Sequence, residues 1–300
     1  MKNVFFFLLT TLISIFGNSQ NHQLEFDKYF KLQDTVNQLK TLKSWEKHNS
    51  KDSELYTSYF NYYFSKSREQ VLALTNDQPN GESLVIQDSS NQNVGFIGDR
   101  IIYNQEILQK GIEKINQGIK LFPNRLDMRF GKIYAFGQVE DWDSFTDEII
   151  ETIEQSSKNN NHWTWTNNEK YGSDVKGFLL DIQNYQLQLY NTRKDELLLK
   201  MRAIANKVLS YHPNHIESLS NLSITYLLND EYDKALEPLF KAEKLNPKDH
   251  IVLGNIAQAY KLKGDKEKAI LYYEKTAEFG DDYAKAYAKQ EIARLKNDKK

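Results

Sequence analysis

The sequence predicts an all-α protein built as a solenoid of stacked helical hairpins. The prediction rests on a pattern of large apolar residues, small residues and a proline whose period is 34 residues. Its two copies are Leu219, Leu222, Tyr226, Ala235, Leu239, Ala242 and Pro247, and then Leu253, Ile256, Tyr260, Ala269 and Tyr273. Apolar residues three and four positions apart share one face of a helix, so each copy predicts two helices whose apolar faces meet. One such hairpin buries too little surface alone, so we expect neighbours to stack.

The pattern resembles the tetratricopeptide repeat (TPR) in its period and in the order of its residues. Ala235 and Ala242 are small, as a close helix crossing requires, and Pro247 ends the second helix. The resemblance implies a non-catalytic scaffold without a cofactor, which binds a protein or peptide partner on its concave surface.

Residues 1–19 are predicted to be a secretory signal peptide. Lys2 precedes an apolar run from Val4 to Phe16, and small residues then precede a cleavage point before Gln20. We therefore expect a secreted or periplasmic protein with no membrane span after signal removal. The chain has no cysteine, which excludes a disulfide framework and a lipid anchor through cysteine.

Residues 20–52 are predicted to form an N-terminal capping helix region. The expected apolar stripe of this helix is Phe30, Leu32, Val36, Leu39, Leu42 and Trp45.

Residues 53–215 are predicted to contain three degenerate repeats, which brings the total to about five. The second-helix spacing of four, three and five residues returns as Gly111, Ile115, Gly118 and Pro123, as Phe145, Ile149, Thr152 and Ser157, and as Met201, Ala205, Val208 and Pro213. First helices are expected around Tyr56, Tyr59 and Tyr63, around Phe130 and Tyr134, and around Tyr185. The extra length between these helices predicts insertions near residues 66–104 and 156–173.

The first insertion has the character of a small β-hairpin. The β-prone runs 84–86 and 94–97 flank a polar, turn-rich stretch. An isolated hairpin is marginally stable in water, so it should either cover the core of the first repeat or await a partner strand.

The second insertion holds Trp163 and Trp165 within an asparagine-rich loop. The two indoles either plug the loop onto the scaffold or form an exposed aromatic platform for a ligand. The platform interpretation gives an alternative function, a carbohydrate or cell-wall binding module.

Residues 216–249 and 250–283 are the two regular repeats, and residues 284–300 are predicted to be a C-terminal capping helix and tail. The apolar side of that helix is expected to carry Tyr283, Tyr287, Ile292 and Leu295.

The resemblance implies partner-binding residues on the first helices of the regular repeats. These are Glu217, Ser220, Asn221, Ile224, Ile251, Asn255 and Gln258. Asn221 and Asn255 are one period apart, so their amides either form a ladder for a peptide backbone or merely cap and solvate the helices. In one TPR subclass, basic residues on this surface clamp a terminal carboxylate. Ser220 and Ile251 are not basic, so we do not expect that ligand here.

The sequence shows little sign of catalytic chemistry. The six histidines are scattered, with His215 and His250 about one repeat apart, so we expect no metal site. There is no phosphate loop and no nucleophile elbow. The 39 basic residues nearly balance 41 acidic ones, and no basic stripe suggests nucleic acid. An enzyme hidden in the insertions would need convergent titratable groups, and the insertions hold only scattered ones.

Overall fold

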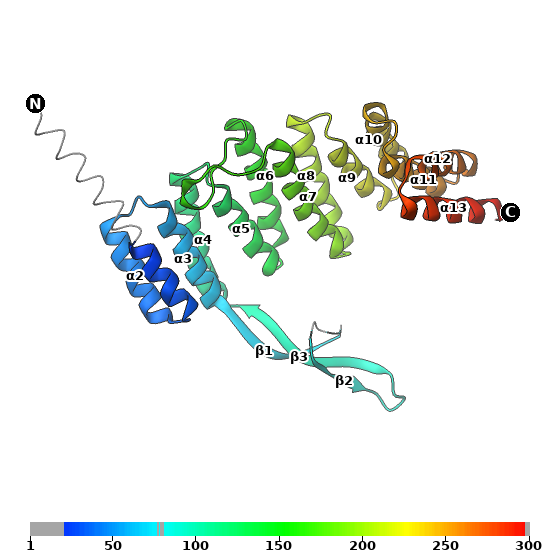
Figure 1. Ribbon diagram of the computed structural model, residues 1–300. Coiled ribbons are helices and arrows are strands. Elements are labelled where there is room, and N and C mark those ends of the chain that lie inside the picture. The colour runs from blue at the N-terminus through cyan, green and yellow to red at the C-terminus, as the bar shows by residue number, and fades with distance from the viewer. Residues whose placement is uncertain (1–20, 77, 79–80, 298–300) are drawn as a thin grey trace, which may run out of the picture. The chain divides into compact units, whose positions relative to one another are not determined.

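The computed structural model describes residues 21–76, 78 and 81–297. The predicted signal peptide and residues 298–300 of the predicted tail lie outside this range. The chain forms two compact units, which we describe separately (Figure 1). Unit 1 contains the described residues up to Asp141 together with His162–Tyr171, and unit 2 contains Trp142–Asn161 and the chain from Gly172 onward. Within the described ranges, no helix has the length and apolar character needed to cross a membrane.

Unit 1 begins with two helices where the sequence predicted a single capping helix. Residues 21–31 are helical, the chain reverses at Gln33 (φ 55°), and α2 (Thr35–His48) runs back. The carboxylate of Asp34 caps α2 by accepting the N–H of Asn37 at 3.0 Å. The predicted stripe was therefore wrong at the reversal, where Leu32 and Val36 are exposed. The buried apolar residues of the two helices are Phe26, Leu42 and Trp45.

The first repeat is an antiparallel hairpin of α3 (Ser53–Ser67) and α4 (Gln105–Leu121), as predicted. The helices approach so closely that α4 carries glycine at both contacts. A Cβ added to Gly111 would lie 3.1 Å from the Cβ of Tyr63, and one added to Gly118 would lie 2.7 Å from the Cβ of Tyr56. The two pairs run in opposite directions along the two helices, which fixes the antiparallel register.

The insertion between α3 and α4 is a three-stranded antiparallel sheet of β1 (Arg68–Thr75), β2 (Ser83–Gln87) and β3 (Asn93–Tyr103), in the order β1-β3-β2. The predicted hairpin is β2 and β3, whereas β1 was not predicted. The sheet projects from the helices as an arm (Figure 1). The N–H of Asn104 donates to the carbonyl of Ser67 at 2.7 Å, so the arm leaves and returns at one point.

The arm does not cover the core of the first repeat, contrary to one of the two expectations. Leu72, Leu74 and Leu84 are each about two-thirds exposed or more. Unit 1 then continues into α5 (Leu126–Gln138).

Unit 2 contains α6 (Trp142–Lys158), α7 (Val175–Asn191), α8 (Leu198–Tyr211), α9 (Ile216–Leu227), α10 (Tyr232–Leu245), α11 (His250–Lys263), α12 (Lys266–Phe279) and α13 (Asp282–Asn297). Two short 3-10 turns, η1 (Thr166–Asn168) in unit 1 and η2 (Asp195–Leu197) in unit 2, interrupt the connections. The helices coincide with the predicted repeats, and α8 and α10 end just before Pro213 and Pro247 as expected. Because α6 extends to Lys158, the second insertion is shorter at its start than predicted.

The two regular repeats turn from their first to their second helix in the same way. The carbonyl of Tyr226 accepts the N–H of Glu231 at 2.9 Å, and that of Tyr260 accepts the N–H of Asp265 at the same distance. Each tyrosine also contacts the preceding second helix: the Arg202 guanidinium lies 3.9 Å from the Tyr226 ring centroid, and Phe240 lies against Tyr260. The 34-residue period of the sequence is thus a period of the structure.

The last helix, α13, packs on α12 and contributes the buried residues Ala288 and Glu291, with Ile292 and Leu295 half-buried. The expected contribution of Tyr283 was wrong, because its side chain is 82% exposed. Glu291 is buried and pairs with Lys261 at 2.5 Å and Arg294 at 2.7 Å.

Candidate functional site

The first helices of three consecutive repeats in unit 2 present equivalent positions to solvent. We call the first-helix face the exposed and half-buried side chains at these positions: Leu187 and Tyr190 on α7, Glu217, Asn221, Ile224 and Leu228 at α9, and Ile251, Asn255, Gln258 and Leu262 on α11. The set repeats with the 34-residue period, because Leu187, Asn221 and Asn255 are successive equivalents. A hydrogen bond from Asn221 of α9 to Gln186 of α7 holds two of the helices next to each other.

The first-helix face is mainly apolar and open to solvent. Leu187 is 52% exposed, Tyr190 46%, Leu228 51% and Ile251 60%. Isolated exposed apolar residues are ordinary on protein surfaces, but several on the same face of neighbouring helices make a patch of the kind that partners cover.

A cavity of about 350 Å³ opens at the carboxyl ends of α7 and α9. Tyr190 and Leu228 line it together with Leu198 and Met201, and the exposed Arg193 and Lys194 stand at its rim. The cavity gives the first-helix face a recess that could accept one apolar side chain of a ligand.

The structure gives the seven residues predicted for partner binding different surroundings. Glu217 and Ile251 are exposed, and Ile224 and Asn255 are half-buried on the first-helix face. Ser220, in contrast, is only 6% exposed, because its side chain turns into the repeat. Its prediction as a contact residue was wrong.

The predicted asparagine ladder does not form. The Nδ2 of Asn221 donates to the Oε1 of Gln186 at 2.9 Å, and the Nε2 of Gln186 donates to the carbonyl of Met201 at 3.0 Å. The Asn221 amide therefore joins neighbouring repeats. Gln258 is also engaged, since its Oε1 accepts the hydroxyl of the buried Tyr273 at 2.9 Å. The Asn255 side chain, in contrast, has no hydrogen bond to the part of the chain that is described.

Sequence reasoning missed Tyr190, Leu228 and Leu262. A signal was present, because Leu228 and Leu262 are one period apart and both follow the last predicted contact position by four residues. The prediction stopped at the middle of each first helix, whereas the cavity lies at its carboxyl end.

The loop after α6 is fixed to unit 1 by backbone pairing. The N–H of Thr164 donates to the carbonyl of Asn124 at 2.8 Å, and the N–H of Leu126 donates back to the carbonyl of Thr164 at 3.0 Å. Trp163 is only 2% exposed, which confirms the plug interpretation for this indole and leaves it no face for a sugar ring. Trp165 is partly exposed and lies against the rings of Phe130 and Tyr171.

A buried arginine fastens the same loop. Arg125 is 1% exposed, and its guanidinium donates to both carboxylate oxygens of Asp127 at 2.9 and 2.7 Å and to Glu54 at 2.6 Å. Asn168 and Asn167 of the loop complete the network, since the Oδ1 of Asn168 accepts from Arg125 at 3.3 Å and the N–H of Asn167 donates to Glu54 at 2.8 Å. Burial lowers the pKa of Arg125, but the hydrogen bonds and charges of Asp127 and Glu54 outweigh it and raise that pKa above its ordinary value. The network therefore has a structural role, because it joins the loop to α3 and to the start of α5.

His215 has a structural role. The Nδ1 of His215 accepts the N–H of Ser218 at 3.3 Å and so caps α9, and burial lowers the pKa of His215. No group of three or more His, Asp or Glu side chains in the described chain is arranged to hold a metal ion.

Comparison with known proteins gives likenesses of fold. No family model and no curated protein matches the chain. Among solved structures, YrrB, described as a TPR protein with an unusual peptide-binding site, is 12% identical with a TM-score of 0.42, over 83% of this chain and 97% of YrrB. The TPR domain of P58(IPK) is 13% identical with a TM-score of 0.35, over 95% of this chain and 67% of that domain. A tetratricopeptide repeat protein from Parabacteroides merdae is 9% identical with a TM-score of 0.30, over 93% of this chain and 99% of that one. The helical hairpins and the 34-residue period of the chain itself show that it has the tetratricopeptide fold.

Proposed function

We propose that the protein is a non-catalytic scaffold that binds a protein or peptide partner through the first-helix face of unit 2. The observation that carries the proposal is the set of exposed apolar side chains that the first-helix face gathers from three neighbouring first helices, among which Leu228 and Leu262 are one repeat period apart. A partner that covers these side chains removes their apolar surface from water, which stabilises the complex by about 25 cal/mol for each Å² buried.

The composition of the face favours a partner with apolar side chains. Tyr190 and Leu228 at the cavity would receive one large apolar side chain, and Ile251 would contact a second one further along. Between them, the Asn255 amide has both a donor and an acceptor to offer to a peptide group.

Peptides selected from a random phage-displayed library on the wild-type protein provide the ligands for a test. The face variant Leu187→Ser, Leu228→Ser, Ile251→Ser removes three exposed apolar side chains from first helices. The control variant Leu199→Ser, Leu245→Ser, Leu271→Ser removes three equally exposed leucines from second helices. Circular dichroism shows whether both variants keep the helical fold.

We expect the face variant to weaken binding of the selected peptides by about tenfold or more in fluorescence polarisation, about 1.4 kcal/mol. The control variant should change the affinity less than about twofold. Equal loss in both variants, or loss only in the control, would place the binding surface elsewhere.

We also infer export of the protein from the cell interior. Lys2, the apolar run from Val4 to Phe16 and the small residues that follow support this proposal. Mass spectrometry of the native protein should find an N-terminus at Gln20, whereas a native protein that begins at Met1 would refute it.

A further inference from the structure

Unit 1 contains two adjoining cavities between α2, α3 and the start of β1. The first has a volume of about 360 Å³ and extends from Phe30 to Arg68 and the base of the arm. The second has a volume of about 380 Å³ and lies along α2 as far as Lys43. Thr35, Tyr62 and Lys66 line both cavities, so the two adjoin, and we call them together the basic groove.

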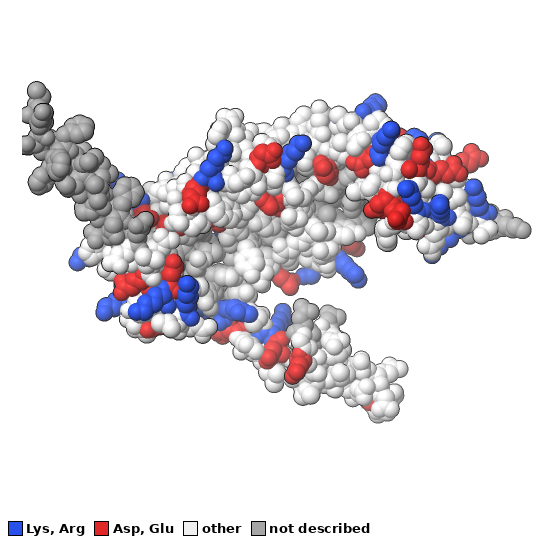
Figure 2. Space-filling view, viewed as in Figure 1, with Lys and Arg blue, Asp and Glu red and all other residues white. Residues whose placement is uncertain are grey.

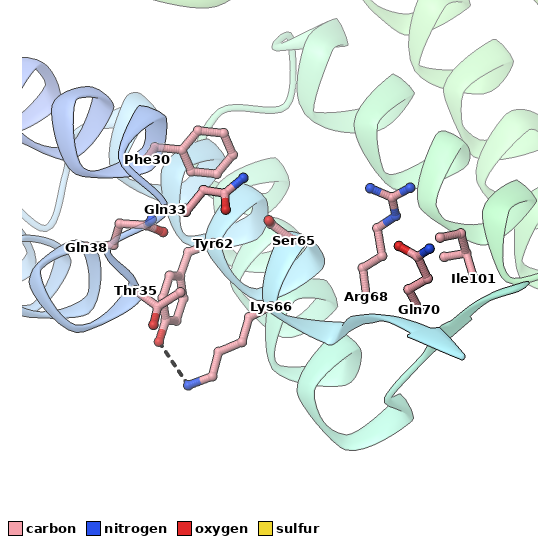
Figure 3. Close-up of a pocket in the computed structure, with 10 residues that line it drawn as sticks. All are labelled: Phe30, Gln33, Thr35, Gln38, Tyr62, Ser65, Lys66, Arg68, Gln70 and Ile101. Atoms are coloured by element: carbon pink, nitrogen blue, oxygen red, sulfur yellow. Dashed lines mark hydrogen bonds between the residues drawn. The ribbon is translucent and has the colours of Figure 1, made fainter. Parts of the chain in front are cut away.

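Four cations line the basic groove, and no aspartate or glutamate does. They are Lys40, Lys43, Lys66 and Arg68. In Figure 3, the Lys66 ammonium reaches the Tyr62 hydroxyl beside Thr35, whereas Arg68 lies beyond Ser65 with its guanidinium pointing away from Lys66.

The four cations lack carboxylate partners within the described ranges of the chain. The Nζ of Lys66 donates only to the hydroxyl of Tyr62, at 3.2 Å, and lies 5.5 Å from the centroid of its ring. Other lysines of the same fold are paired, such as Lys114 with Glu46 at 2.5 Å and Lys207 with Glu154 at 2.6 Å.

Two carboxylates near the basic groove, Asp34 and Asp99, are occupied locally. Asp34 caps α2 by accepting from both the backbone and the side chain of Asn37. Asp99 accepts from the amide of Gln70 at 2.8 Å. In a chain whose net charge is −2, four uncompensated cations around the basic groove create a local positive potential that attracts anions.

The walls of the basic groove are partly apolar. Val36 is 77% exposed, Phe30 is 39% exposed, and Leu39 and Tyr62 add further apolar surface to the lining. The hydroxyls of Thr35 and Ser65 and the amide of Gln33 add neutral hydrogen-bond donors at the rim. A ligand that complements all of these groups carries negative charges and apolar side chains in alternation.

We infer that the basic groove is a second binding site, which takes an acidic peptide segment with interspersed apolar side chains. Charge complementarity supports the assignment, and the hollow shape favours a narrow chain over a flat lipid surface. From Thr35 to Lys43 the helix rises about 12 Å, which an extended peptide spans with about four residues. The site lies in unit 1, so it is independent of the proposed function of the first-helix face.

The test uses the full mature chain and fluorescein-labelled, end-capped peptides of sequence Glu-Leu-Glu-Leu-Glu-Leu, Gln-Leu-Gln-Leu-Gln-Leu and Lys-Leu-Lys-Leu-Lys-Leu. Inorganic phosphate and vesicles of phosphatidylglycerol are the other two probes. The groove variant is Lys40→Gln, Lys66→Gln, Arg68→Gln. The control variant is Lys47→Gln, Lys51→Gln, Lys110→Gln, which changes the net charge equally with exposed lysines of the same unit.

We expect the Glu-Leu peptide to bind the wild type, and the groove variant to weaken this binding by about tenfold or more while the control changes it less than about twofold. The affinity should fall as the salt concentration rises from about 0.01 M to about 0.15 M. Unchanged binding in the groove variant, or equal binding of the Gln-Leu or Lys-Leu peptide, would overturn the inference. If phosphate competes at concentrations equal to that of the Glu-Leu peptide, the groove binds anions in general, and the inferred recognition of apolar side chains is wrong. Vesicle binding that needs the groove lysines, with no peptide binding, would make the surface a membrane contact instead.

Discussion

Replacing Arg125 by methionine should break the hydrogen-bond network that holds the loop with Trp163 and destabilise unit 1. The guanidinium is 1% exposed, and removing it leaves the carboxylates of Glu54 and Asp127 largely buried without their cation. Breaking a buried ion pair from one side costs about 3 to 5 kcal/mol, against about 0 to 1 kcal/mol for an exposed pair. Glu54 keeps the N–H of Asn167 as a donor, so we expect a value near the lower limit of about 3 kcal/mol.

Urea unfolding followed by tryptophan fluorescence measures this cost. Three of the four tryptophans belong to unit 1, so a Trp142→Phe background makes the signal specific for that unit. Far-ultraviolet circular dichroism reports on both units together. The midpoint of the fluorescence transition should shift to lower urea in Arg125→Met.

A companion variant separates the loss of charge pairing from the loss of packing. The triple variant Arg125→Met, Glu54→Gln, Asp127→Asn leaves no uncompensated charge, so it should recover most of the stability that the single variant loses. A single-variant cost below about 1 kcal/mol would show that the network behaves as an exposed pair and would refute the reasoning. A triple variant as unstable as the single one would show that packing dominates.

Two further substitutions test the helix contacts. Gly118→Ala should destabilise the protein by about 1 to 3 kcal/mol in thermal unfolding, because the new Cβ would lie 2.7 Å from the Cβ of Tyr56. Gly131→Ala should stabilise it by up to about 1 kcal/mol, because its new Cβ meets only the ring edge of Phe60 at 3.5 Å. The opposite order of stability would contradict the packing of α3 on α4. The hydrogen bond from Lys261, and then the charges of Lys261 and Arg294, lower the pKa of Glu291 below its ordinary value of 4.5 despite burial, so its stabilising contribution is complete above that value and is lost as the pH falls through the lowered pKa. The stability difference between wild type and Glu291→Gln should therefore shrink between about pH 5 and about pH 3, and a constant difference would contradict this origin.

The repeat period predicted the helices well because it reports on packing. Tyr226 and Tyr260 accept the same backbone hydrogen bond on successive repeats, and the spacing that contains Gly111 and Gly118 placed α4 correctly even though the arm separates it from α3. Spacing of this kind survives long insertions, since the core contacts of a hairpin depend on the two helices and not on their connection.

Features that depend on contacts between distant residues could not be predicted. The repeat equivalent of Asn221 on α7 is Leu187, but the Asn221 amide bonds to the neighbouring Gln186, so the repeat period did not predict this hydrogen bond. Strand β1 lacks polar and apolar alternation from Val71 to Thr75, because both faces of the arm meet solvent. The N-terminal helix pair was missed because apolar residues continue through its reversal at Gln33.

The candidate site was predicted in its position but only partly in its residues. The period placed Ile224 and Ile251 on the correct face, but it could not show that Ser220 turns inward. A rotation of one residue is 100° around a helix, so neighbours in sequence differ completely in exposure. The basic groove had no sequence signature, because Lys40 and Arg68 come from separate elements.

The pairing of α3 with α4 across the arm is the feature on which the repeat architecture of unit 1 depends, and engineered disulfides test it directly. The chain has no cysteine, so Tyr63→Cys with Gly111→Cys introduces a single pair whose Cβ atoms would start 3.1 Å apart, within a few tenths of an ångström of disulfide geometry. Tyr63→Cys with Gly118→Cys is the control, since seven further residues of helix displace the second sulfur by about 10 Å. Peptide mapping by mass spectrometry after mild oxidation should find the intramolecular disulfide in the first variant and free thiols in the control. Free thiols in the first variant, or equal cross-linking in both, would contradict the paired helices.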